Sequence, residues 1–235
     1  MCQACDARLT SRRQFLTAAA AGAAVTIAPS AFAAGGPTTQ LSADEALARL
    51  KAGNAKFVQG PELCAAHLAE QRDHVAKHQA PWATIVSCAD SRVPPELLFG
   101  GLGVGELFVA RNAGNMVDTA TMGTIEYGSG VLGVPLIVVL GHERCGAVAA
   151  ACEVVEKGTR FPGSIAPMVE AIVPAARAVA GKPGDFVDNA VRESAIRSAR
   201  KIATESPVVA ELVAQGKVKV LAGRYDLDDG LVEFF

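Results

Sequence analysis

The chain has 235 residues, of which 50% are hydrophobic and 20% are charged, and its formal net charge at pH 7 is −2. This length is enough for one large domain with a sizeable core, and the high apolar share excludes a disordered chain. The charge balance lacks the basic excess of a protein that binds nucleic acid, and six unevenly spaced cysteines exclude a small disulfide-stapled scaffold.

The first 33 residues have the pattern of an export signal. The pair Arg12-Arg13 lies in a segment that resembles the twin-arginine signal, and an uncharged, alanine-rich stretch follows over residues 15–28. At about 1.5 Å per residue this stretch is too short to span about 30 Å of hydrocarbon, so the protein is not expected to span a membrane. Ala31-Phe32-Ala33 fits a signal-peptidase site. We therefore expect removal of residues 1–33 and a periplasmic or secreted protein; the alternative is a buried alanine-rich helix behind a surface arginine pair.

Residues 34–235 are predicted to form a single domain, because no linker or internal repeat interrupts them. The domain begins with a helical arm over residues 41–79. Ser42 and Glu45 have the spacing of a capping box, which predicts the start of a helix there. That helix is expected to end at Gly60.

A second helix of the arm is predicted over residues 62–79. It carries His67, His74 and His78, which would share one helical face. We interpret this face as a polar surface, exposed to solvent or at an interface, rather than as a metal site.

Strands and helices alternate along the rest of the chain. Short apolar runs rich in β-branched residues predict strands at 83–87, 107–110, 135–140, 218–222 and 231–235. Helical patterns occupy 119–132, 144–156, 164–180, 185–204 and 206–215. Such alternation is typical of an α/β fold. We therefore predict a mostly parallel central sheet flanked by helices, with the N-terminal helical arm added to it.

Residues capable of metal chemistry follow two of the predicted strands. The strand 83–87 runs into Cys88-Ala89-Asp90-Ser91-Arg92, and the strand 135–140 runs into a segment that contains His142 and Cys145. Because ligands of parallel sheets bind at the carboxyl ends of strands, these two segments are expected to meet at one edge. Two cysteines and one histidine, with a fourth position left open, are the ligand set of a catalytic zinc site rather than a structural one.

Each of these residues also has a simpler interpretation. A lone Cys88 or Cys145 is most often a small buried apolar residue, and a lone His142 is most often a hydrogen-bonded core residue. The two cysteines could also form a disulfide in an oxidising compartment. The coincidence favours a metal site, since both cysteines and the one histidine outside residues 62–79 fall at the two strand ends. Asp90 and Arg92 add charges that are costly there unless they are paired or used.

Together these motifs resemble those of the β-class carbonic anhydrases. The resemblance rests on the segments 88–92, 107–115, 125–127, 141–148 and 223–226, and it covers the chain from about Leu41 to the C-terminus. It implies that Cys88, His142 and Cys145 bind Zn²⁺, with Asp90 and Arg92 as an ion-paired catalytic dyad beside the metal. The implied reaction is the reversible hydration of CO2 to bicarbonate and a proton, by attack of zinc-bound hydroxide on CO2.

The same resemblance implies a substrate pocket and an oligomer. Gln79, Phe108 and Tyr127 occupy the positions of residues that line the CO2 pocket in members with an open zinc site. Ile85 stands where members with a closed site carry a bicarbonate-binding tryptophan. We therefore expect the open state; in the closed alternative, Asp90 would be the fourth zinc ligand. The family is at least dimeric, with its pocket at the subunit boundary and its N-terminal helices wrapped on the partner, so a homodimer or tetramer is expected in which the arm 41–79 contacts the partner.

Two other functions fit the same residues. Some relatives use such a zinc site to hydrolyse carbonyl sulfide or carbon disulfide. From another functional class, the chain could be a non-catalytic zinc- or redox-binding protein, in which Asp90 and Arg92 form only an ion pair. An assay of CO2 hydration distinguishes the enzyme from the binding protein, and the same assay on carbonyl sulfide distinguishes the two enzymes.

Overall fold

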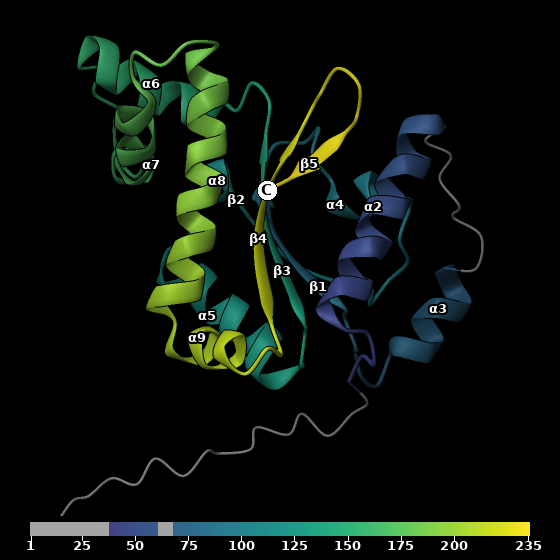
Figure 1. Cartoon of the computed structure of the whole chain (residues 1–235). Coiled ribbons are helices and arrows are strands. Elements are labelled where there is room, and N and C mark those ends of the chain that lie inside the picture. The colour runs from purple at the N-terminus through teal and green to yellow at the C-terminus, as the bar shows by residue number, and fades with distance from the viewer. Residues whose placement is uncertain (1–37, 61–67) are drawn as a thin grey trace, which may run out of the picture. The chain divides into compact units, whose positions relative to one another are not determined.

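The computed structural model describes residues 38–60 and 68–235 (Figure 1). The predicted export signal, residues 1–33, lies outside the described residues and stays a prediction, as does the division of the chain at residue 34. His67 also lies outside them. Within the described ranges, no helix is both long enough and apolar enough to cross a membrane.

In the described part of the chain, five strands form one sheet in the order β2-β1-β3-β4-β5. Their bounds are Ala83–Cys88 for β1, Leu107–Asn112 for β2, Leu136–His142 for β3, Lys219–Tyr225 for β4 and Val232–Phe234 for β5. The first four strands are parallel to one another, and β5 is antiparallel to β4. The prediction of a mostly parallel central sheet is confirmed.

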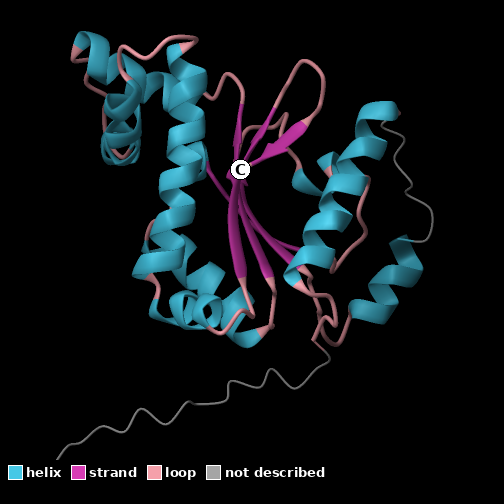
Figure 2. Ribbon diagram, in the orientation of Figure 1, coloured by secondary structure: helices cyan, strands magenta, loops and turns pink. Residues whose placement is uncertain are grey.

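Helices cover both faces of this sheet (Figure 2). One side carries α2 (Ala43–Gln59), α3 (Leu68–Val75) and α4 (Pro95–Leu98). The other side carries α5 (Thr119–Glu126), α6 (Gly146–Lys157), α7 (Ile165–Val179), α8 (Phe186–Glu205) and α9 (Pro207–Ala214). The predicted flanking helices are therefore present, and α4 is an additional short helix.

The core follows from the alternation of side chains along the central strands. Val138 of β3 lies in one buried cluster with Leu50 of α2, whereas the next residue, Val139, lies in another with Ile202 of α8. All four side chains are fully buried. A strand that is apolar on both faces must be covered on both, and this fixes the three-layer arrangement.

The first predicted helix of the arm is confirmed, and it belongs to the core of its own chain. Ser42 caps α2 through the expected box with Glu45, in which each side chain bonds to the other residue's backbone N–H. Ala46 of α2 is fully buried against the sheet. At Gly53 a side chain would collide with the backbone at the C-terminal end of α4, since an ideal Cβ would lie 1.9 Å from the carbonyl oxygen of Phe99, the residue that follows this helix. Glycine is therefore needed for the close approach of the two helices.

The second predicted helix of the arm is shorter than expected, because α3 ends at Val75 rather than near residue 79. The segment after Val75 has no apolar stripe to bury, and Pro81 disfavours helical backbone in the residue before it. His78 consequently lies beyond the helix, and His74 lies in its last turn. The expected histidine face over 62–79 is not formed by the described residues.

Candidate metal centre

Three potential metal ligands meet at the carboxyl ends of two neighbouring strands. Cys88 is the last residue of β1, His142 is the last residue of β3, and Cys145 caps the start of α6. Because β1 and β3 are parallel neighbours, their ends lie at the same edge of the sheet. The two sulfurs and one ring nitrogen all lie within 4.8 Å of one another, and all three residues are buried. The structure thus brings together the three ligands that the sequence suggested.

The His142 ring is oriented as a metal-binding imidazole. Its Nδ1 lies 2.8 Å from the Glu143 carbonyl oxygen, which can only accept, so Nδ1 carries the proton and donates it. The other nitrogen, Nε2, is buried and has no hydrogen-bond partner. A buried lone pair without a partner is costly unless an ion binds it. This nitrogen therefore fits a cation held between the two sulfurs and the ring.

Cys88 and Cys145 are free thiols, so the alternative of a disulfide between them is not formed in this structure. The neighbouring Cys145 thiol lowers the pKa of Cys88, and the nearby Cys88 sulfur, together with burial, raises the pKa of Cys145. The Gly114 N–H also points at the Cys88 sulfur, 3.4 Å away. Gly114 has a φ of +76°, and a side chain there would meet Ile172, so the close approach of this amide depends on glycine. The donors stabilise a thiolate, the form that binds metal.

The turn from His142 to Cys145 requires an unusual backbone. Arg144 has a φ of +52°, in the left-handed region that non-glycine residues rarely adopt. Its side chain forms a double ion pair with Asp228, at 3.1 Å and 2.6 Å, which holds this conformation. The turn directs the Cys145 sulfur back toward the ring that lies three residues earlier.

Asp90 and Arg92 form the expected pair beside the three ligands. Arg92 donates to Asp90 through its backbone N–H, its Nε and its Nη2, at 2.9, 2.9 and 2.8 Å. The Arg92 guanidinium holds the pKa of the Asp90 carboxyl well below its usual range, so Asp90 is ionised at neutral pH. Asp90 Oδ2 lies 3.9 Å from Nε2 of His142. A fixed carboxylate therefore lies beside the ligand cluster.

Arg111 supports this arrangement and was not singled out as a site residue from the sequence. Its Nε donates to the Cys88 carbonyl at 2.9 Å, and its Nη2 donates to the Asp90 carbonyl at 2.6 Å. Arg111 lies on β2 directly beside Ser87 of β1. A positively charged residue at the end of an apolar strand can indicate a site residue. To use that indication here, one would need to know that β2 lies next to β1, and the sequence does not give the order of the strands.

The three proposed pocket residues lie away from this centre in the same chain. Phe108 pairs with Thr84, four residues before Cys88, which is about 13 Å along the strand. The Phe108 and Tyr127 rings stack with their centroids 6.1 Å apart. Gln79 is exposed and precedes β1. These residues lie at the amino end of the sheet, and one chain does not bring them to the three metal ligands.

Sequence comparisons match this chain to carbonic anhydrases. Residues 83–232 match a family model described as carbonic anhydrase. Carbonic anhydrase 2 of Mycobacterium tuberculosis is 40% identical over 186 residues, which are 77% of this chain and 87% of that protein. A carbonic anhydrase of Mycolicibacterium smegmatis is 38% identical over 186 residues, covering 78% of this chain and 89% of the relative.

Solved structures with the same fold are β-carbonic anhydrases. One from Coccomyxa, in complex with acetazolamide, has a TM-score of 0.61 and 29% identity, and the match covers 80% of this chain and 85% of that one. One of two tetrameric enzymes from Sordaria macrospora has a TM-score of 0.63 and 26% identity, covering 71% of this chain and 88% of the other. The similarity to these enzymes therefore includes the central sheet as well as the sequence motifs at the ends of its strands.

Proposed function

Because the chain belongs to the carbonic anhydrase family, in its β class, we propose that it hydrates CO2 reversibly to bicarbonate and a proton on a Zn²⁺ held by Cys88, His142 and Cys145. The observation that carries the proposal is the cluster of two buried thiol sulfurs and one ring nitrogen of His142 within 4.8 Å of one another, in which the buried Nε2 of that ring has no hydrogen-bond partner. Two thiolates and a neutral imidazole balance the charge of Zn²⁺ and leave its fourth position open. When bound there, Zn²⁺ supplies the Lewis acidity that lowers the pKa of a water molecule.

Asp90 and Arg92 have separate roles in this proposal. The Asp90 carboxylate is an acceptor beside the cluster, so it orients a reacting water by accepting one of its hydrogens. Arg92 donates three hydrogen bonds to that carboxylate and so engages both of its oxygens, which disfavours Asp90 as a fourth zinc ligand. We therefore propose the open state of the site. The fully buried Ile85 supports the open state. Members with a closed site carry a tryptophan at this position, and isoleucine has no counterpart of its indole N–H donor.

The function is tested by stopped-flow CO2 hydration with the zinc-loaded protein and with the same protein after removal of the metal. We expect acceleration only with zinc bound. Acceleration that persists after the metal is removed would contradict the proposal. A protein that binds one zinc per chain but does not accelerate CO2 hydration would also contradict it, and would favour a non-catalytic zinc- or redox-binding protein. Faster turnover of carbonyl sulfide than of CO2 under the same conditions would favour the alternative hydrolase.

We propose that the substrate pocket is completed by a second copy of the chain. Gln79, Phe108 and Tyr127 lie at the opposite end of the sheet from Cys88, so they serve a metal centre only if they belong to a neighbouring subunit. Tyr127 is 46% exposed, although it is a large aromatic residue stacked on Phe108, as expected of a surface that another chain covers. The tetrameric relative from Sordaria macrospora supports an oligomer.

A mixed oligomer tests this pocket directly. The chain His142→Ala lacks a metal ligand, and the chain Gln79→Ala/Tyr127→Ala lacks two exposed pocket residues; each is expected to have little activity alone. When the two are unfolded together and refolded, random pairing makes roughly half of the dimers mixed, and each mixed dimer regains one complete site. We expect recovery of roughly a quarter of the parent CO2 hydration rate. If the pocket and the metal ligands of one site belonged to the same chain, no activity would return, because each site would lack either His142 or the two pocket residues.

We propose, separately, that the protein is exported by the twin-arginine route, on the basis of residues 11–33 of the sequence. That route carries folded proteins, so zinc would bind both thiolates before they meet an oxidising compartment. Replacing Arg12 and Arg13 by lysine is expected to retain the protein in the cytoplasm. Cell fractionation measures this, and unchanged export would disprove the signal.

A further inference from the structure

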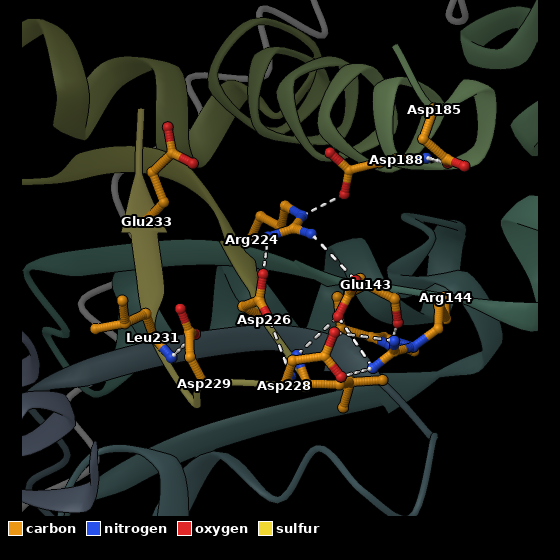
Figure 3. Close-up of polar contacts among 12 residues, drawn as sticks. Glu143, Arg144, Asp185, Asp188, Arg224, Asp226, Asp228, Asp229, Leu231 and Glu233 are labelled. Carbon is orange, nitrogen blue, oxygen red and sulfur yellow. Dashed lines mark hydrogen bonds and ion pairs between the residues drawn. The ribbon is translucent and has the colours of Figure 1, made fainter. Parts of the chain in front are cut away.

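The residue that follows the ligand His142 is held by a network of ion pairs centred on Arg224 (Figure 3). The Arg224 side chain, on β4, is only 11% exposed. It donates to Asp226 at 2.9 Å and to Asp188 of α8, and its Nη2 lies 3.8 Å from Oε1 of Glu143. One largely covered guanidinium thus contacts carboxylates from three separate segments, which its planar, forked shape permits and a lysine would not.

Glu143 connects this network to the metal centre. Its backbone N–H donates to the Tyr225 carbonyl at 2.9 Å, and its Oε2 accepts from the Leu227 N–H at 3.1 Å. Its carbonyl accepts from Nδ1 of His142 at 2.8 Å. The direction of that carbonyl sets the proton position and the plane of the imidazole, so whatever fixes Glu143 also orients the ligand nitrogen.

The carboxylates of this network would separate without their arginines. Oxygens of Glu143, Asp226 and Asp228 lie within 4.8 Å of one another, a distance at which like charges repel. Arg224 lies between Glu143 and Asp226, and Arg144 pairs with Asp228 and lies 3.2 Å from Glu143. Without Arg224 the Glu143 and Asp226 carboxylates would face each other with no cation between them, so we expect the Glu143 side chain to move away from the loop that follows β4 and to shift its own carbonyl.

We infer that Arg224 is a positioning residue for the zinc ligand His142, acting through Glu143. This inference rests on the proposed zinc-dependent function. It assigns a role to the segment 223–226, which contributes no metal ligand and does not contact the substrate in the proposed reaction. It also gives a reason for the position of Arg224, which has three carboxylate neighbours and pairs in the β3–β4 register with Gly141, the residue before His142.

The test compares Arg224→Gln with Arg192→Gln. Arg192 is the matched control, because it bonds to the same Asp188, and to Glu233, but makes no contact with Glu143. Zinc affinity is measured by competition with a chromophoric chelator, and site geometry by the visible absorption spectrum of the Co²⁺-substituted protein. For Arg224→Gln we expect affinity to fall roughly tenfold or more, with a shifted Co²⁺ spectrum, as for other residues that orient a metal ligand. Arg192→Gln should match the parent in both.

Unchanged zinc affinity and an unchanged Co²⁺ spectrum in folded Arg224→Gln would overturn the inference, and so would an equal loss in Arg192→Gln. If Arg224→Gln does not fold, Glu143→Gln decides instead, because glutamine keeps an acceptor for the Leu227 N–H but loses the ion pair with Arg224; it too should weaken zinc binding. A parent protein that binds zinc but does not hydrate CO2 would refute the proposed function while leaving the affinity comparison valid.

Discussion

Replacing Cys88 by serine is expected to abolish tight zinc binding and to lower CO2 hydration by a factor on the order of a thousand or more. Serine keeps the size of the side chain, but its hydroxyl does not ionise near neutral pH and is a poor ligand for Zn²⁺. The centre is then left with one thiol and one imidazole, and the open fourth position loses its function. Zinc content per chain and stopped-flow CO2 hydration measure the two effects.

Cys152 provides the matched control for this substitution. It is also a free, buried cysteine and lies on α6, the helix that begins at Cys145, but it is not among the three clustered ligands. Burial raises the pKa of its thiol to about 11, so it is not a thiolate at neutral pH. Cys152→Ala is expected to retain one zinc and parent activity. A Cys88→Ser protein that still binds zinc tightly and hydrates CO2 would show that the assignment of the metal centre is wrong.

The convergence of the metal ligands was predictable because it depends on a rule of topology. Once 83–87 and 135–140 are recognised as buried parallel strands, their carboxyl ends must lie at one edge of the sheet. Cys88 and His142 stand at those ends, and Cys145 lies three residues after His142, at the start of α6. The fold class was predictable from the same strands, since continuous apolar residues require helices on both faces.

Features that depend on strand register could not be read from the residues themselves, and a pocket at the subunit boundary was expected only from the family resemblance. The contact between Arg224 and Glu143 requires β4 to lie beside β3 in one particular register. The separation of Phe108 from Cys88 follows from the pairing of β1 with β2, and its consequence for the pocket appears only in an oligomer. The early end of α3 was missed because a polar helix has no apolar stripe that marks its length.

Replacing Asp90 by asparagine is expected to lower kcat/KM for CO2 hydration by roughly a hundredfold while leaving one zinc bound per chain. Asparagine has nearly the same shape, but it presents no charge to Arg92 and its amide group can rotate to donate where the carboxylate accepts. The reacting water then loses its fixed acceptor. Zinc analysis and stopped-flow kinetics on the same preparation separate loss of metal from loss of catalysis.

Asp44→Asn is the control, because Asp44 also forms an ion pair, with Lys219, but lies on the exposed side of α2 away from the metal centre; its activity should equal that of the parent. Two results for Asp90→Asn would contradict the proposal, the first by excluding the open state and the second by excluding a catalytic role for Asp90. Loss of zinc would show that Asp90 is itself a ligand, as in the closed alternative. Unchanged kcat/KM would show that the carboxylate beside His142 serves only to pair with Arg92, since removing its charge then leaves the reacting water oriented as before.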